Sequence, residues 1–247
     1  MPRFFVRQER VCDGCISIIG EDAHHIARSL RMATGDEITV CDMQGNEYSC
    51  EILSFDEDRE VMTKILSSKK AENEPFVYIK LFQALPKGDK LDTIIQKAVE
   101  CGASEIIPFQ SERCVVKIKN DAEERKTERR QRIAAEAAKQ CGRSVIPSVR
   151  ESVDFDEAIK MAEDSELCLF CYEGDETRPL GQILKEYGNE LPQSISIFIG
   201  SEGGFSIREA AIAREKGMAM TGLGRRILRT ETASGFVLAC LVCASEL

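Results

Sequence analysis

The spacing of apolar residues along the chain changes character near residue 70. Between Glu37 and Leu66, short runs of alternating apolar and polar residues are separated by turn residues, such as the Gln-Gly-Asn at 44–46. A period of two is typical of strands that bury one face, so this part predicts a small antiparallel barrel or sheet. A helical pattern over 22–32 precedes it, and the polar, proline-terminated stretch 67–75 predicts a linker.

Beyond the linker, near-continuous apolar runs alternate with helical patterns. Such runs are typical of strands buried on both faces, and their alternation with helices predicts an α/β fold with a parallel sheet covered on both sides. Ligands of such sheets bind beyond the carboxyl ends of the strands. The strand-like runs are 76–85, 104–110, 144–149, 166–172 and 194–200, and the helical patterns are 87–101, 121–140, 154–163 and 180–187.

Composition indicates the kind of protein and the cellular compartment to expect. The chain has 247 residues, a net charge of −9 and 43% hydrophobic residues, as expected of a folded globular protein. The longest apolar run, 233–244, is too short to span a membrane, and the first residues are too polar for a signal peptide. Eleven cysteines without an export signal favour a reducing compartment, so we expect a soluble, cytoplasmic protein.

The cysteines include three C-x-x-C pairs, but we predict no metal site. A structural zinc site would need two such pairs close together with exposed thiolates. Two of the three pairs lie in apolar runs, where cysteine is expected to act as a small hydrophobic residue. The two histidines, His24 and His25, are adjacent, and no H-E-x-x-H motif is present. The three pairs are Cys12/Cys15, Cys168/Cys171 and Cys240/Cys243.

The clearest candidate loop follows the apolar run 194–199. It reads Gly-Ser-Glu-Gly-Gly over 200–204, and Ser206 and Glu209 then have the spacing of a capping box that opens a helix. Glycines allow the backbone to turn sharply and to approach a ligand closely. The stretch lacks the Lys-Ser/Thr of a phosphate P-loop. Glu202 between the glycines could hold a polar or cationic group of a ligand, or could be incidental to a tight turn.

A second candidate loop lies between a short strand-like run, A-M-T-G-L-G at 219–224, which ends in glycines, and the last apolar run. Arginines stand at 225, 226 and 229, and Thr230 is a plausible N-cap, with Glu231 in the first helical turn. A guanidinium cannot lose its charge, so three of them close together suggest an anionic ligand or substrate. Ile227 and Leu228 would suit an aromatic ring of a ligand, or equally a core.

These two loops together carry a resemblance to a known family. I-G-S-E-G-G-F-S at 199–206, followed by L-G-R-R-I-L-R-T-E-T-A at 223–233, closely resembles the 16S ribosomal RNA (uracil-N3) methyltransferases of the knotted SPOUT class. H-H-I-A-R-S-L-R-M-A-T-G-D-E-I at 24–38 matches the opening pattern of the same family, so the resemblance covers essentially the whole chain. Ser201 and Arg225 stand where the family usually has proline, which bears on the rigidity of the loops.

The resemblance implies a PUA-like RNA-binding β-barrel over residues 1–70 and a SPOUT methyltransferase domain over 74–247, with a C-terminal trefoil knot. It implies S-adenosylmethionine bound in a bent form at the knot, and a homodimer with its sites at the subunit interface. The residues expected around the cofactor are Tyr172, Glu173, Ile199, Gly200, Gly203, Leu223, Gly224, Arg226, Ile227, Leu228 and Thr230.

The implied reaction is methylation of N3 of a specific uridine in 16S ribosomal RNA, within the small ribosomal subunit. Arg229, with Arg226, would stabilise the charge that spreads over O2 and O4 as the N3 proton leaves. The proton acceptor is Glu202, Glu231 or water. The net charge argues mildly against a nucleic-acid partner, but a local basic face suffices for phosphate contacts. Those contacts are expected from Arg3, Arg7, His25, Arg28 and Arg31.

Other functions stay open on the sequence alone. A methyltransferase acting on transfer RNA or 23S RNA would share both loops. A non-catalytic RNA-binding or assembly protein would bind RNA without the cofactor, although Glu202 and Arg229 make this less attractive. A nucleotide-binding dehydrogenase or transferase is disfavoured, because no G-x-G-x-x-G motif is present.

Overall fold

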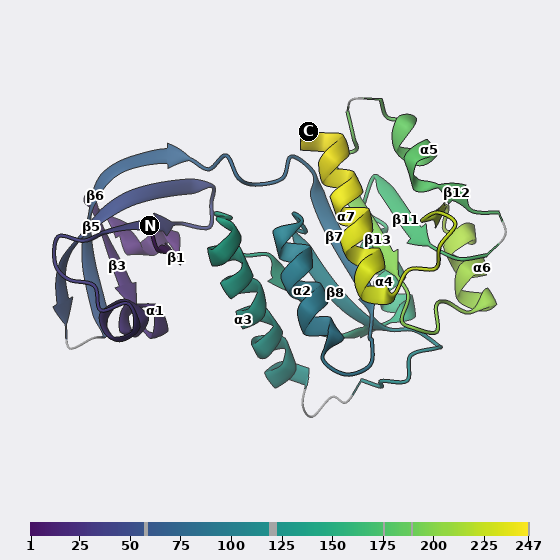
Figure 1. Cartoon of the computed structure of the whole chain (residues 1–247), viewed down its shortest axis with the longest axis horizontal. Helices are drawn as coiled ribbons and strands as arrows, with labels where there is room; N and C mark the ends of the chain where they lie inside the picture. The colour runs from purple at the N-terminus through teal and green to yellow at the C-terminus, as the bar shows by residue number, and fades with distance from the viewer. Residues whose placement is uncertain (57–58, 119–122, 175, 189, 247) are drawn as a thin grey trace. The chain divides into compact units, whose positions relative to one another are not determined.

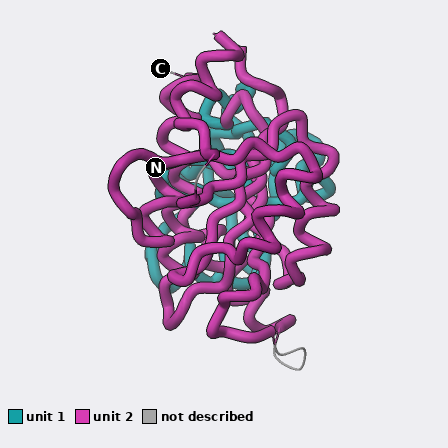
Figure 2. The backbone as a smooth tube through the Cα atoms, turned by 90° about the vertical axis from the view of Figure 1, so that its right-hand side faces the viewer, with its two compact units in different colours: residues 1–74, 138–146 teal, residues 75–137, 147–247 magenta. Residues whose placement is uncertain are grey.

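The chain folds into two units, which Figure 2 colours separately. The computed structural model describes residues 1–56, 59–118, 123–174, 176–188 and 190–246. Unit 1 comprises Met1–Glu74 together with Ala138–Ile146, and unit 2 comprises Pro75–Ala137 together with Pro147–Leu247. The segment 138–146 therefore belongs with the N-terminal unit although it lies far along the chain.

Unit 1 is built on a sheet whose described strands follow the order β1-β4-β5-β6-β3-β2. Its pairs are antiparallel, apart from the parallel pair of β1 with β4. The strands are β1 (Arg3–Phe5), β2 (Val11–Cys12), β3 (Cys15–Ile19), β4 (Glu37–Cys41), β5 (Asn46–Asp56) and β6 (Glu60–Lys70). The short helices are η1 (Gln8–Arg10), α1 (Glu21–His24) and η2 (His25–Ser29).

The alternating pattern predicted the middle of this sheet correctly. Ile38 and Val40 on β4, and Cys50 and Ile52 on β5, are fully buried, while the residues between them face outward. The predicted linker is wrong at its start, because β6 continues to Lys70 and pairs with β5 there. Backbone pairing extends a polar strand as readily as an apolar one, so composition did not reveal it. The strands β1 to β3 were not predicted.

Unit 2 contains a parallel sheet, whose described strands follow the order β10-β8-β7-β13-β11-β14-β12, with β9 paired to β8. The strands are β7 (Tyr78–Ala84), β8 (Glu105–Gln110), β9 (Ser148–Val149), β10 (Val153–Asp154), β11 (Leu167–Cys171), β12 (Arg178–Pro179), β13 (Ser194–Ile199) and β14 (Ala219–Gly222). The helices are α2 (Lys90–Glu100), α3 (Glu123–Cys141), α4 (Phe155–Ala162), α5 (Leu180–Lys185), α6 (Ile207–Glu215) and α7 (Thr230–Glu246).

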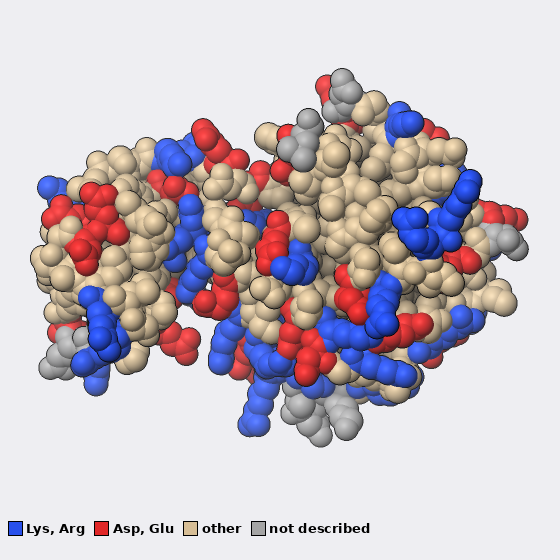
Figure 3. All heavy atoms as spheres, in the orientation of Figure 1, with Lys and Arg blue, Asp and Glu red and all other residues tan. Residues whose placement is uncertain are grey.

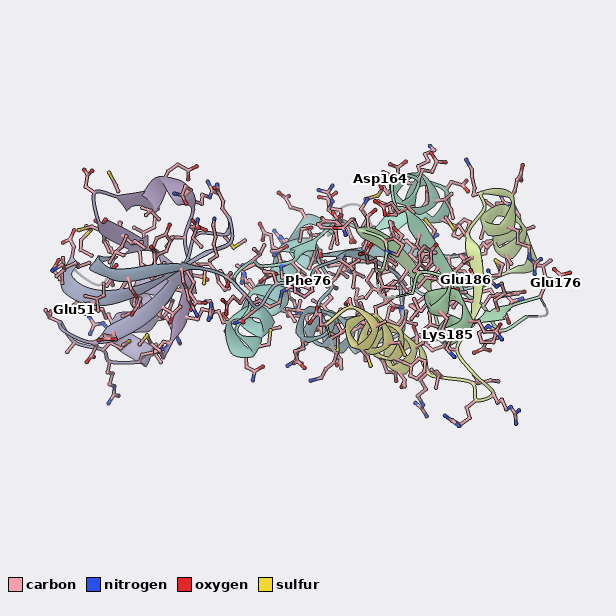
Figure 4. All side chains as sticks on the ribbon, turned by 90° about the horizontal axis from the view of Figure 1, so that it is seen from above. Glu51, Phe76, Asp164, Glu176, Lys185 and Glu186 are labelled. Atoms are coloured by element: carbon pink, nitrogen blue, oxygen red, sulfur yellow. The ribbon has the colours of Figure 1, made fainter. Side chains whose placement is uncertain are left out.

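The predicted α/β architecture with a parallel sheet is confirmed, and most predicted elements agree with the structure to within a few residues. The run 144–149 is an exception, since only its last two residues form a strand. The predicted helix 121–140 begins at Glu123 among the described residues, and its first two residues lie outside them. The two views in Figures 1 and 4 show α2 and α7 on one face of the sheet and α4 on the other.

Aromatic side chains fill the core on the sheet. Phe82 on β7 stacks on Phe198 of β13, with ring centroids 4.4 Å apart. Phe205, just after β13, lies 4.1 Å from Phe170 of β11 by the same measure. All four side chains are at most 2% exposed. Because Phe205 is buried there, the loop that precedes it is anchored to the sheet at its far end.

The strand order determines which loops meet at the carboxyl edge. Parallel strands end at the same edge, and β7, β13, β11 and β14 are consecutive neighbours. The segments after them are therefore adjacent. After β14 the chain returns to α7, which packs beside α2 and β13. The connecting segment 223–229 must therefore pass the end of β11.

Candidate active site at the carboxyl edge of the parallel sheet

The first candidate loop, Gly200–Gly204, is a tight turn whose geometry favours glycine at two positions. The Gly204 N–H donates to the Ser201 carbonyl at 2.9 Å, and Gly204 has a φ of +64°. A Cβ on Gly200 would lie 3.0 Å from the Gly204 Cα atom, which is tighter than nearly all Cβ contacts in proteins. The sequence prediction of a sharp glycine turn is confirmed.

The predicted capping box at the start of α6 is also present. The Ser206 hydroxyl accepts from the Glu209 N–H at 3.1 Å, and the Ser206 N–H donates to Glu209 Oε2 at 2.8 Å. Glu209 is 1% exposed and its Oε1 also accepts from the Glu112 N–H at 2.9 Å. One buried carboxylate therefore joins this loop to the segment after β8. Arg113 of that segment donates to the Gly203 carbonyl at 3.1 Å.

Glu202 points toward the start of α2. Its carboxylate accepts from the Lys87 N–H at 3.2 Å and from Lys90 Nζ at 2.7 Å. Burial by itself would raise the pKa of Glu202, but the hydrogen bonds from Lys90 and from backbone N–H groups outweigh it and hold the pKa below its ordinary value. Glu202 is thus an anion at neutral pH, and its donors are already supplied by the protein.

The second candidate segment, 223–229, is exposed. Arg225, Arg226 and Arg229 are all exposed, and within the described part of the chain none of them forms an ion pair. Ile227 is 82% exposed. Figure 4 shows the side chains of this segment extending away from the rest of unit 2, and Figure 3 shows basic side chains gathered where it runs. The three neighbouring arginines therefore have no acidic partner among the residues that the structure describes.

Thr230 joins the two candidate loops. Its hydroxyl donates to the Gly200 carbonyl at 2.6 Å and accepts from Gln83 Nε2 at 2.9 Å. Thr230 was predicted to be the N-cap of the last helix, and this is wrong. α7 begins at Thr230 itself, and the Arg229 carbonyl accepts from the Ala233 N–H at 2.8 Å. The hydroxyl is used in a tertiary contact instead, which local sequence cannot reveal.

Lys90, which the sequence did not single out, lies between the two loops. Besides its bond to Glu202, its Nζ lies 3.7 Å from Glu231 Oε2. That oxygen is buried and accepts no hydrogen bond from the described residues. The sequence did contain a pattern that could have indicated Lys90. A lysine in the first turn of a helix is unfavourable next to the helix dipole, so its presence there suggests that acidic side chains lie nearby.

Tyr172 and Glu173 follow β11 at the same edge. The Tyr172 N–H donates to the Thr221 carbonyl at 3.0 Å, which continues the pairing with β14. The Tyr172 ring lies against Gly174, where it leaves no room for a Cβ. Glu173 is exposed. Since β11 lies between β13 and β14, the structure brings the predicted cofactor residues to neighbouring strand ends.

Comparison with known proteins decides the family. A sequence profile described as an RNA methyltransferase domain matches residues 72–242, and one described as an RNA methyltransferase PUA domain matches residues 18–61. The chain belongs to the RNA methyltransferase family. The resemblance drawn from the two loops is confirmed, as are the enzyme class and the PUA-like character of the N-terminal region.

Individual relatives of this methyltransferase are also named as methyltransferases. It is 36% identical to the Ribosomal RNA small subunit methyltransferase E of Bacillus subtilis, over 100% of this chain and 98% of that protein. The crystal structure of a Ribosomal RNA small subunit methyltransferase E from Neisseria gonorrhoeae, bound to S-adenosylmethionine, is 28% identical with a TM-score of 0.85, covering 99% and 98% of the two chains. A Legionella pneumophila structure with S-adenosylmethionine is 29% identical over 98% and 97%, with a TM-score of 0.86.

The methyltransferase's predicted RNA-binding residues all lie in unit 1, and the structure separates them into two kinds. Arg7, His25, Arg28 and Arg31 are exposed. Arg3 is different, because its Nη1 bonds Glu47 at 2.7 Å and its side chain is only 14% exposed. The prediction that Arg3 contacts phosphates is therefore disfavoured, since its guanidinium is used inside the unit.

The cysteines differ in part from the prediction. Cys243 on α7 is exposed and Cys240 is half-buried, so the last pair does not act as buried hydrophobic residues. α7 buries only one face, which its continuous apolar sequence concealed. Burial raises the pKa of Cys168 to about 11. Among the described residues no cluster of three or more His, Cys, Asp or Glu side chains could hold a metal ion, and no helix is long and apolar enough to cross a membrane.

Proposed function

We propose that this methyltransferase transfers the methyl group of S-adenosylmethionine to N3 of a uridine in 16S ribosomal RNA of the small subunit. The observation that carries the proposal is the hydrogen bond between Thr230 and Gly200, which joins the two loops. Beside it lie exposed arginines that form no ion pair with any residue the structure describes. The name of the relatives and the ligand named in the Neisseria structure support the substrate and the cofactor.

The residues at the sheet edge suit this cofactor. Glu231 Oε2 is a buried acceptor that receives no hydrogen bond from the described part of the chain, as expected where a ligand supplies an N–H group. Glycines at the loop ends leave backbone groups accessible, which suits recognition of an adenosine by main-chain atoms. When bound, S-adenosylmethionine supplies a methyl group on a cationic sulfur. The residues proposed to hold it are Tyr172, Glu173, Ile199, Gly200, Gly203, Leu223, Gly224, Arg226, Ile227, Leu228 and Thr230.

The chain's own task in the reaction is to stabilise the uracil as N3 loses its proton. Negative charge then spreads over O2 and O4 of the ring. Arg229, assisted by Arg226, is proposed to donate hydrogen bonds to that charge, which requires guanidinium groups not already paired within the protein. The proton passes to Glu202, Glu231 or water. Tight positioning of the ring against the methyl donor provides the rest of the acceleration.

The trefoil knot is part of the same proposal. The connection from β14 to α7 passes the end of β11 and is fixed to β13 by the Thr230–Gly200 hydrogen bond. We propose domain limits of 1–70 for the RNA-binding barrel and 74–247 for the knotted methyltransferase domain. Arg7, His25, Arg28 and Arg31 are proposed to grip phosphates of the RNA.

A homodimer, working in the cytoplasm, completes the proposal. The outward face of α7 carries apolar groups, and Phe236 there is 41% exposed. Thr232, Ala239 and Cys243 on the same helix are also exposed. A second copy of the chain covering this helix would bury that face and place the site near the subunit interface.

Mass mapping of ribosomal RNA from cells that lack this protein tests the proposal. We expect 16S RNA to lose a methyl group on one uridine, and the wild-type chain to restore it. Loss of a methyl group from 23S or transfer RNA instead would support those substrates. Unchanged RNA, together with no binding of S-adenosylmethionine by the purified chain, would support a non-catalytic role.

A further inference from the structure

Lys90 connects three segments that are far apart in the sequence. Its Nζ lies 2.7 Å from Glu202 Oε1, after β13, and 3.7 Å from Glu231 Oε2, in the first turn of α7. Lys90 itself is the first residue of α2. All three side chains are about one-third exposed or less, at 33%, 30% and 26%. Among the described residues, Lys90 is thus the one basic residue that is ion-paired with both carboxylates.

The positive charge of Lys90 lies at the start of α2, where several effects oppose it. Desolvation and the nearby Arg229 both lower the pKa of Lys90. The first turn of a helix also disfavours positive charge. The hydrogen bond to Glu202, with the charges of Glu202 and Glu231, outweighs these effects and raises the pKa of Lys90. Without the ammonium group, the two carboxylates would face each other unscreened across the joined loops.

Lys90 also makes the two carboxylates unequal. Glu202 accepts from Lys90 and, with both oxygens, from the Lys87 N–H. Glu231 Oε2 accepts from no described residue, although it is buried. The ammonium therefore fixes Glu202 as a structural anchor, whereas Glu231 Oε2 keeps an unused capacity to accept a hydrogen bond among the described residues.

We propose that Lys90 is a positioning residue, which holds the two loops together and directs Glu231 Oε2 toward an N–H donor of a bound ligand. The inference rests on the proposed function and assigns different roles to its two candidate carboxylates. The donor is either the amino group of the cofactor or the N3–H of the uracil. Both are nitrogen-bound hydrogens, and an experiment can distinguish them.

The test compares Lys90→Gln with Lys97→Gln in the full chain. Lys97 lies on the same helix and pairs with Glu100, away from both loops, so it is a matched control. We expect Lys90→Gln to slow single-turnover methyl transfer to 16S RNA roughly ten- to a hundredfold, as small misplacements in active sites do. Lys97→Gln should remain within about twofold of wild type, as expected for an exposed ion pair.

The pH profile separates positioning from a general loss of structure. In Lys90→Gln the affinity for S-adenosylmethionine should improve as the pH falls toward about 5, because protonation of a carboxylate relieves the repulsion. The wild type, screened by Lys90, should lack this improvement. Lys90→Arg keeps the positive charge and should retain most of the rate. If Lys90→Gln does not fold, Lys90→Arg and Glu231→Gln still test the idea.

Glu231→Gln identifies the donor. Weaker cofactor binding would point to the amino group, whereas slower transfer with unchanged cofactor affinity would point to the uracil. Equal rates and equal pH profiles for Lys90→Gln, Lys97→Gln and wild type would overturn the inference while leaving the proposed function intact. A wild-type chain that neither binds S-adenosylmethionine nor methylates RNA would instead overturn the proposed function.

Discussion

The two loops of the site are built in opposite ways. Gly200–Gly204 is fixed along its length, by the Gly204–Ser201 hydrogen bond, by Arg113 and Lys90, and by the buried ring of Phe205 at its end. The segment 223–229 is tied at its end by Thr230, while its arginines and Ile227 extend into solvent. One loop of the candidate site is thus held in place by the protein, and the other presents exposed side chains that could contact a ligand.

The largest expected effect on the reaction rate comes from the exposed segment 223–229. Arg229→Ala should lower the rate of single-turnover methyl transfer by about 10²–10³-fold, the usual effect of removing a donor to developing charge. The Kd for S-adenosylmethionine, measured by calorimetry, should change far less. Arg225→Ala is the matched control, because Arg225 is equally exposed in the same segment and has no proposed role in the reaction. A wild-type rate for Arg229→Ala would contradict the assignment.

In the Gly200–Gly204 loop, we expect a substitution to act by distorting the backbone. Gly200→Ala places a Cβ 3.0 Å from the Gly204 Cα atom, so the backbone must move. We expect the free energy of unfolding to fall by about 1–3 kcal/mol, as in other overpacked sites, and cofactor affinity to fall with it. Gly181→Ala on α5 is the control, since no atom lies within 4 Å of its added Cβ. Denaturant unfolding of both variants measures the difference, and equal stabilities would show that the turn is not rigid.

Unit 1 also contains two arginines in different surroundings, since Arg3 is ion-paired and partly buried whereas Arg7 is exposed. Arg3→Ala should destabilise the fold, because it leaves Glu47 without its closest partner. Arg7→Ala should leave stability unchanged but weaken RNA binding and reduce the slope of log affinity against log salt by about 1. Filter binding at several salt concentrations, with thermal unfolding of both variants, distinguishes the two. RNA binding that does not depend on salt would contradict the role of Arg7.

The smallest expected effect is a change in the pH dependence of stability when Glu202, in the Gly200–Gly204 loop, is replaced. The folded-state pKa of Glu202 is lowered, so its contribution to stability is present above its unfolded pKa and is lost as the pH falls through the folded value. The difference in unfolding free energy between wild type and Glu202→Gln should therefore shrink on acidification below about pH 4. Denaturant titrations over that range measure it. A difference that stays constant with pH would mean that the Lys90 contact adds no stability.

Local patterns in the sequence predicted the features that depend on neighbouring residues. The period of two predicted β4 and β5, and the spacing of Ser206 and Glu209 predicted the capping box. The glycines at 200–204 predicted the tight turn. Each of these depends on contacts within a few positions of the chain, or on a repeat that the chain itself displays.

The remaining features depended on the order of the strands in space. Lys90 and Glu202 are 112 positions apart, and they meet because β7 and β13 are neighbours in the sheet. The same order gave the Thr230 hydroxyl a carbonyl partner 30 positions away. In unit 1, the pairing of β1 with β4 places Arg3 in the strand beside β4, and its side chain reaches Glu47. A sequence specifies which side chains can form such contacts, but only tertiary pairing decides which of them are used within the fold and which remain for a ligand.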